Sequence, residues 1–159
     1  MNRLMNILRK NTGRFPLGIW MALIALILIS FAWIMQAYSL WNWEEAVKLN
    51  LQNSSFHGNE VEFAWATKER GEAIADLIWP MPLTLIALIG IMKKRFIGFI
   101  TSLMVFAICI YFPLFYLFQL WNTHIETVMA AILLWGIPSL LGIAGLWANR
   151  HIYQPKINH

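Results

Sequence analysis

The chain has 159 residues, of which 59% are hydrophobic and only 13% are charged. Ordinary globular domains contain about 45–50% apolar and about 25% charged residues, and a chain this short has no interior large enough to bury such an excess, so the composition excludes a soluble globular domain. It also excludes a disordered chain, which would be less hydrophobic, while the net charge of +4 does not indicate nucleic-acid binding, because most basic residues flank apolar stretches.

The N-terminal segment, residues 1–14, places Leu4 and Ile7 among basic residues. This pattern predicts a short helix lying on the inner leaflet of a membrane, with a frayed basic tail as the alternative. A charge-free apolar stretch follows over residues 17–38 and is long enough to cross a bilayer. It is too long for the apolar region of a cleaved signal peptide, so we expect it to remain as a transmembrane helix.

The next segment, residues 39–73, is the only sizeable polar region and is expected to form an outer loop. The pattern of this segment predicts two short helices, Trp43–Leu51 and Glu60–Glu72, on either side of a turn-rich break at residues 53–58. Both helices mix apolar and charged residues. We therefore expect them to lie at the membrane interface over the mouth of the helix bundle.

Three further apolar stretches cover residues 74–92, 96–118 and 127–148. Each has the length of a transmembrane helix, and none shows the alternation of a barrel strand. The sequence therefore predicts an all-α integral membrane protein, in which residues 1–159 form a single membrane domain with four transmembrane helices in an antiparallel bundle. The very short link at residues 93–95 makes the second and third helices antiparallel neighbours.

The basic residues fix the expected orientation of this bundle. Nine of the twelve would lie on one side of the membrane, and an excess of Lys and Arg marks the cytoplasmic side. Both termini are therefore predicted to be cytoplasmic, in a cell membrane of the plasma or inner type. All eight acidic residues would lie on the opposite side or at its boundary.

Prolines and aromatic residues near the predicted outer boundary suggest a ligand cleft. Pro80, Pro82 and Pro113 fall at a similar depth in two adjacent helices, and bends there could open an outward-facing cleft. The alternative interpretation is an aromatic belt at headgroup level, with Asp76 and Glu126 solvated at helix N-termini. The candidate ligand-binding residues are Asp76, Trp79, Tyr111, Trp121, His124 and Glu126.

Small residues recur at steps of three along the fourth apolar stretch: Gly136, Ser139, Gly142 and Gly145. Small residues let helices approach closely in lipid. The stripe predicts a tight contact between helices of this chain. The alternative is a face that docks another membrane protein or a second copy of the chain.

The sequence contains no motif for catalysis, metal ligation or cofactor binding, and its single cysteine, Cys109, excludes an internal disulfide and a Cys-x-x-Cys motif. We therefore predict no catalytic residue, no metal and no cofactor. The first functional hypothesis is a small multi-pass membrane protein acting as a non-catalytic accessory or interaction subunit, with the lipid bilayer and another membrane protein as partners and no nucleic acid. The alternative is a binding or transport protein for a small apolar or cationic ligand in the aromatic cleft. A membrane enzyme using Asp76, His124 and Glu126 comes third.

Overall fold

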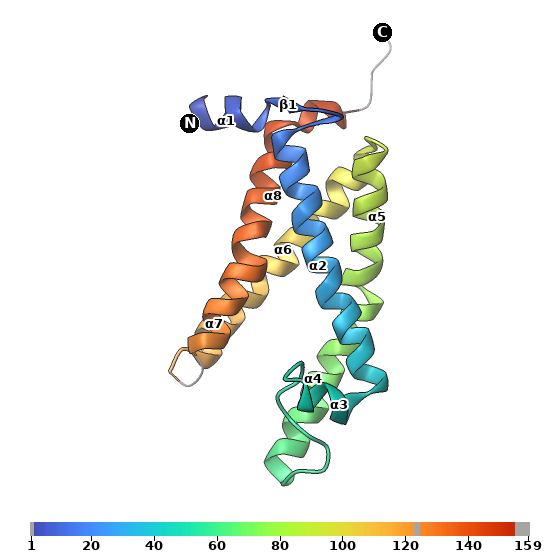
Figure 1. The fold of residues 1–159 in the computed structure, drawn as a ribbon, viewed down its shortest axis with the longest axis vertical. Helices are drawn as coiled ribbons and strands as arrows, with labels where there is room; N and C mark the ends of the chain where they lie inside the picture. The colour runs from blue at the N-terminus through green and yellow to red at the C-terminus, as the bar shows by residue number, and fades with distance from the viewer. Residues whose placement is uncertain (1, 123–124, 155–159) are drawn as a thin grey trace. The chain divides into compact units, whose positions relative to one another are not determined.

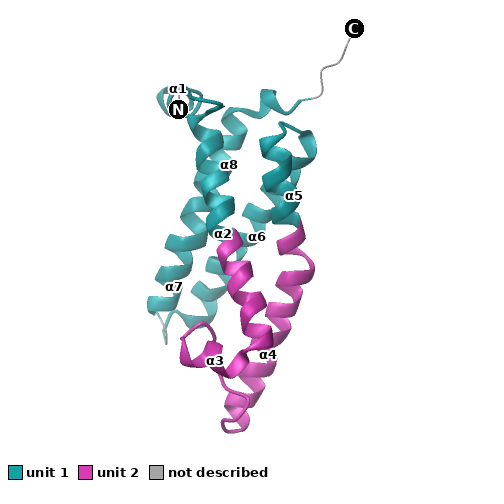
Figure 2. Ribbon diagram, turned by 45° about the vertical axis from the view of Figure 1, so that its right-hand side comes forward, with its two compact units in different colours: residues 1–29, 83–159 teal, residues 30–82 magenta. Residues whose placement is uncertain are grey.

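The computed structural model covers the chain and describes residues 2–122 and 125–154. The regular secondary structure of the described part is helical apart from one pair of two-residue strands. It divides into two compact units, which are treated separately below: unit 1 contains residues 1–29 and 83–159, and unit 2 contains residues 30–82 (Figure 2). The elements are α1 (Asn2–Leu8), β1 (Asn11–Thr12), β2 (Phe15–Pro16), α2 (Leu17–Trp41), α3 (Trp43–Lys48), α4 (Glu60–Ile78), α5 (Pro80–Met92), α6 (Phe96–Leu120), α7 (Ile125–Ala131), the π-helix η1 (Ile132–Gly136), α8 (Ile137–Ala148) and the 3₁₀-helix η2 (Arg150–Ile152).

Four helical stretches among the described residues are long and apolar enough to cross a membrane, which confirms that part of the prediction. Three of them begin and end within three residues of the predicted limits. The stretches are Leu17–Trp41, Glu60–Met92, Phe96–Leu120 and Ile125–Ala148.

The second stretch differs most from the prediction, because the expected separate helix Glu60–Glu72 is the first part of α4. Asn59 caps α4: its side-chain oxygen accepts hydrogen bonds from the backbone N–H groups of Val61 and Glu62, both at 3.0 Å. No residue between Glu72 and Ile78 interrupts the helix, and α5 begins at Pro80, a residue favoured in the first turn of a helix.

The predicted helix Trp43–Leu51 is shorter than expected and ends at Lys48. Asn50 adopts a left-handed conformation with φ of 55°, and the N–H of Leu51 donates to the carbonyl of Ala46. Asparagine tolerates this conformation better than most residues do, and it closes the last turn of a helix. The apolar pattern of the sequence does not indicate this stop signal.

Unit 1 begins with α1, which confirms the predicted short helix over the frayed tail. A tight antiparallel strand pair follows, with Asn11 opposite Pro16 and Thr12 opposite Phe15. Gly13 has φ of +81° in the turn, a value that suits glycine. The indole N–H of Trp20 donates to the carbonyl of Thr12 at 2.9 Å, which fastens the strand pair to α2.

Close approaches at glycine hold the helices of unit 1 together. A Cβ atom on Gly18 of α2 would lie 2.7 Å from the Cα of Gly145 in α8. Gly142 faces the ring of Phe106 in α6, and Gly136 faces Pro113. The predicted contact between helices of this chain is therefore confirmed, and Gly136, Ser139, Gly142 and Gly145 are all buried.

The last apolar stretch is interrupted by η1, directly before Pro138. The N–H of Ile137 donates to the carbonyl of Ile132, five residues earlier. Proline has no N–H to donate to the residue four positions before it, and a π-turn shifts the hydrogen-bond pattern by one residue. The missing donor at Pro138 is thus accompanied by a π-turn in the preceding residues.

Candidate functional site

Unit 2 contains a folded lobe, residues 43–78, organised around the side chain of Phe56. The ring of Trp43 packs against Phe56 with ring centroids 5.3 Å apart, and Phe63 packs against it at 5.6 Å. The guanidinium of Arg70 lies 5.7 Å from the same ring. The indole N–H of Trp43 donates to the carbonyl of Ser54 at 2.9 Å. These contacts give the segment between α3 and α4 a defined structure.

Hydrogen bonds to two carboxylates fix the same segment at two points. The carboxylate of Glu44 accepts from the hydroxyl of Ser55 at 2.6 Å and from the backbone N–H of Phe56 at 3.0 Å. The hydrogen bond from Ser55 is the main reason that the pKa of Glu44 is lowered. The carboxylate of Glu69 accepts from the backbone and side chain of Asn53, at 3.3 and 3.0 Å.

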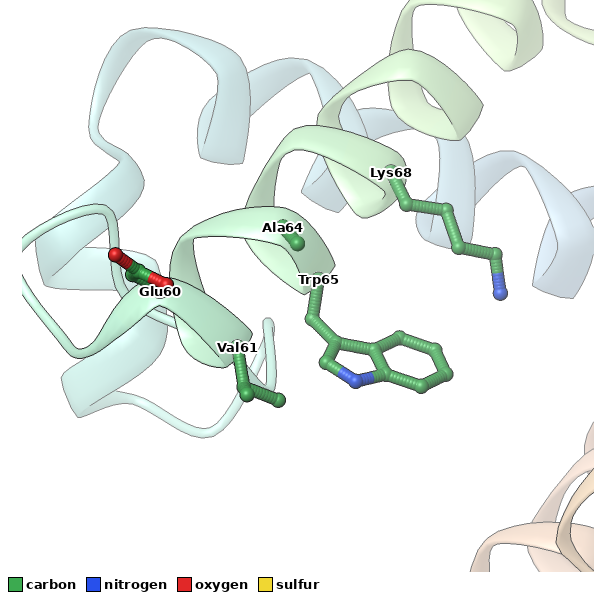
Figure 3. Close-up of a pocket in the computed structure, with 5 residues that line it drawn as sticks. All are labelled: Glu60, Val61, Ala64, Trp65 and Lys68. Atoms are coloured by element: carbon green, nitrogen blue, oxygen red, sulfur yellow. The ribbon is translucent and has the colours of Figure 1, made fainter.

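This fixed lobe presents a groove of about 420 Å³ along one side of α4 (Figure 3). Spacings of three and four residues bring its members to one side of the helix. Val61 and Trp65 are 65% and 42% exposed, so the groove has an apolar floor open to its surroundings. The lining residues are Glu60, Val61, Ala64, Trp65 and Lys68.

Negative charge exceeds positive charge in the lobe that carries the groove. The ammonium group of Lys68 lies 4.6 Å from the centre of the Trp65 ring and 3.6 Å from a carboxylate oxygen of Glu72, so nearby groups already offset its charge. Glu60 lies at the other end of the groove (Figure 3). The lobe as a whole carries seven acidic and three basic residues. The groove therefore combines an apolar floor with a net negative surrounding.

The sequence did not predict this groove, because the helix Glu60–Glu72 was expected to lie at the membrane interface over the mouth of the bundle. The signal was present: Val61 and Trp65 are four residues apart, and Lys68 follows three residues later. The predicted helix start at Glu60 is confirmed. What the pattern could not show was that the side of the helix carrying all three residues is exposed and forms a groove.

The predicted cleft residues fall in both units. In unit 2, Asp76 is 7% exposed, and Trp79, at the junction of α4 and α5, is 58% exposed. In unit 1, Tyr111 of α6 is 62% exposed and its ring stacks on Phe115 at 6.2 Å, while Trp121, which follows α6, is 56% exposed. His124 lies outside the described residues.

The alternative interpretation placed Asp76 and Glu126 at helix N-termini. This is confirmed for Glu126 and wrong for Asp76. Glu126 is exposed in the first turn of α7. Asp76 is buried near the C-terminal end of α4, because α4 starts sixteen residues before it and not at the expected boundary. Within residues 2–122 and 125–154, no three His, Cys, Asp or Glu side chains lie together as a metal site would require.

Comparison of the chain with family models, with curated proteins and with solved structures found no match. The class of the protein is therefore defined by its own features. It is an all-helical chain with four helices of membrane-spanning length and composition and a folded acidic lobe.

Proposed function

We propose that the protein is a non-catalytic accessory subunit of a membrane complex. In this proposal the four apolar stretches span a cell membrane of the plasma or inner type as an antiparallel bundle, with both termini in the cytoplasm. The four helices of membrane length support insertion. The concentration of nine basic residues at the termini and in the link at residues 93–95 supports the orientation.

The observation that carries the accessory role is the exposed groove on α4. Large apolar side chains open to the surroundings in a fixed lobe are typical of surfaces that bind another protein. Trp65 at the centre of the groove is the kind of aromatic residue that dominates such interfaces. The net negative charge of the lobe selects a partner segment that combines an apolar side chain with basic groups. We therefore propose a different membrane polypeptide with such a segment as the occupant.

Site-specific photo-crosslinking in the native membrane tests this proposal. A benzophenone amino acid at Val61 or Trp65 should give an adduct with one defined polypeptide. The same group at Thr67, which is exposed but does not line the groove, is the matched control and should not give that adduct. Copurification of the adduct partner should fall with Trp65→Ala and persist with Thr67→Ala. Equal adducts at all three positions, or adducts with lipid alone, would contradict the proposal.

A second candidate function is favoured by Asp76, which is the one buried carboxyl group among the described residues. Asp76 lies sixteen residues before Met92 in a stretch of membrane-spanning length, which corresponds to about 24 Å along a helix. This distance places Asp76 near the outer end of the proposed span. Because a buried acidic residue in a membrane helix usually serves binding or transport, Asp76 would belong to a site for a small cationic ligand near the outer face.

The intact mass of particles purified in mild detergent separates the two functions. A particle that contains a second polypeptide supports the accessory role. A chain with a bound small molecule and no second polypeptide contradicts that role and supports the ligand site at Asp76.

A further inference from the structure

One end of unit 1 carries a concentration of positive charge. It comprises α1, the strand pair, the turn between α5 and α6, and the end of α8 (Figure 1). Residues 1–43 and 77–125 contain no acidic residue at all, so no carboxylate of these segments offsets that charge. The basic residues described at this end are Arg3, Arg9, Lys10, Arg14, Lys93, Lys94, Arg95 and Arg150.

Hydrogen bonds hold α1 against this end of the unit. The guanidinium Nε of Arg9 donates to the carbonyl of Ala148 at 2.9 Å. The side chain of Asn149, which is 1% exposed, donates to the carbonyls of Leu8 and Gly145 at 3.1 and 2.9 Å. The position of α1 is therefore determined by α8, and the basic residues of α1 are displayed on a fixed support.

The strand pair is held by a similar combination of contacts. A terminal nitrogen of Arg14 donates to the carbonyl of Met92, at the end of α5, at 3.2 Å. The buried ring of Phe15 lies 5.2 Å from the guanidinium of Arg14 and 5.6 Å from the ammonium of Lys94. Positive groups from two distant parts of the sequence thus meet around one aromatic ring.

An open groove of about 600 Å³ runs along α1, lined by Arg3, Asn6, Ile7, Arg9 and Lys10. Its polar members are three basic side chains and one amide, all of which can donate hydrogen bonds to phosphate oxygens. Apolar surface adjoins them, because Ile7 and Leu4 are 49% and 58% exposed. The groove therefore joins an anion-binding surface to an apolar one.

We propose that this groove binds the headgroup of an anionic glycerophospholipid. Arg3 and Lys10, with the N–H groups of Arg9 that do not bond Ala148, bind the phosphate, and Asn6 donates to a headgroup oxygen. The upper acyl segments pack on Leu4 and Ile7. Basic pockets next to membrane helices recognise anionic headgroups through this combination of charge and apolar contact. The inference rests on the membrane insertion in the proposed function but not on the partner at α4.

Native mass spectrometry of the full chain in mild detergent tests the site, with equimolar phosphatidylglycerol and phosphatidylcholine as probes. The wild type should retain phosphatidylglycerol selectively. The double variant Arg3→Gln/Lys10→Gln should bind it about thirtyfold less tightly at low ionic strength, the effect of losing two basic residues near an anionic surface. Both side chains are exposed, so the variant should unfold at the wild-type temperature.

The matched control is Lys93→Gln/Arg95→Gln, which removes the same charge from the same end, although neither residue lines the groove. It should retain most of the binding. Equal losses in the two variants would show diffuse attraction and overturn the site, as would equal retention of the two lipids by the wild type. Displacement of the lipid by inorganic phosphate would also overturn it. None of these results alters the crosslink at Trp65, so failure here is distinguishable from failure of the accessory role.

Discussion

Substitution of Gly145 by alanine should weaken the packing of α2 on α8. A Cβ atom at this position would lie against the carbonyl oxygen of Gly18 and 2.8 Å from the Cα of Gly18. Both obstacles belong to the backbone, so rotation of a side chain cannot relieve the overlap. The helices must separate, and the carbonyl of Gly145 would then move relative to the Asn149 side chain that donates to it.

The magnitude follows from two opposing effects. Overpacking lowers the free energy of unfolding by up to about 3 kcal/mol. Replacing glycine by alanine inside a helix raises it by about 1 kcal/mol. The net loss of about 2 kcal/mol corresponds to a decrease of about 4–8 °C in the unfolding temperature of a chain of this size. Gly71 of α4 is the matched control, because a Cβ atom there meets nothing within 4 Å. Gly71→Ala should raise the unfolding temperature slightly.

Thermal unfolding in detergent, followed by tryptophan fluorescence, measures both variants against the wild type. An unfolding temperature for Gly145→Ala equal to or above that of the wild type would refute the reasoning, as would an equal decrease for Gly71→Ala. A change in particle mass without a change in stability would show that the glycine contacts a second copy of the chain, which was the alternative interpretation of this stripe.

Two further variants test a contact between the two ends of the sequence and a contact within the lobe. Asn149→Ala should lower the free energy of unfolding by about 1–3 kcal/mol, because the buried carbonyl of Leu8 loses its donor. Limited proteolysis should then cut residues 1–16 faster in this variant than in the control Asn42→Ala, whose side chain is exposed. The folded-state pKa of Glu44 lies below its ordinary value of 4.5, so its stabilising effect is present above pH 4.5 and is lost as the pH falls through the lowered pKa. Glu44→Gln should therefore unfold at a lower temperature than the wild type at pH 7 and at the same temperature in strong acid, and a constant difference across this range would contradict the assignment.

The four apolar helices could be predicted because a run of about 20 apolar residues with little or no charge is typical of a helix that spans a membrane. The limits of the first helix illustrate this: the predicted span 17–38 is extended only to Trp41. The small-residue stripe was equally readable, since close helix packing in lipid requires small side chains. In both cases the information is local and repeats along one segment.

Features that depend on single residues or on distant contacts could not be read in the same way. The conformation of Asn50 ends α3 early, and Gly13 allows a tight turn that no apolar pattern announces. α4 continues through Glu72 because no residue there stops the helix. The change from charged to apolar composition at residues 73–74 predicts a boundary at a point where the helix does not end. The contact of Arg14 with Met92 joins residues 78 positions apart. The α1 groove rests on contacts of this distant kind, whereas the α4 groove lies within residues that were predicted to be helical.

The two proposed binding surfaces have opposite electrostatic character, and this limits what each can bind. Acidic residues are confined to residues 44–76 and Glu126. All charged residues of α1 and of the link at residues 93–95 are basic. An anionic headgroup is repelled by the lobe around Trp65, and a basic partner segment is repelled by the groove around Arg3 and Lys10. Each surface therefore excludes the other's ligand by charge while both offer apolar area. The accessory role requires only that the α4 groove remain open to a protein, and the net negative charge of the lobe keeps anionic lipids from competing for it.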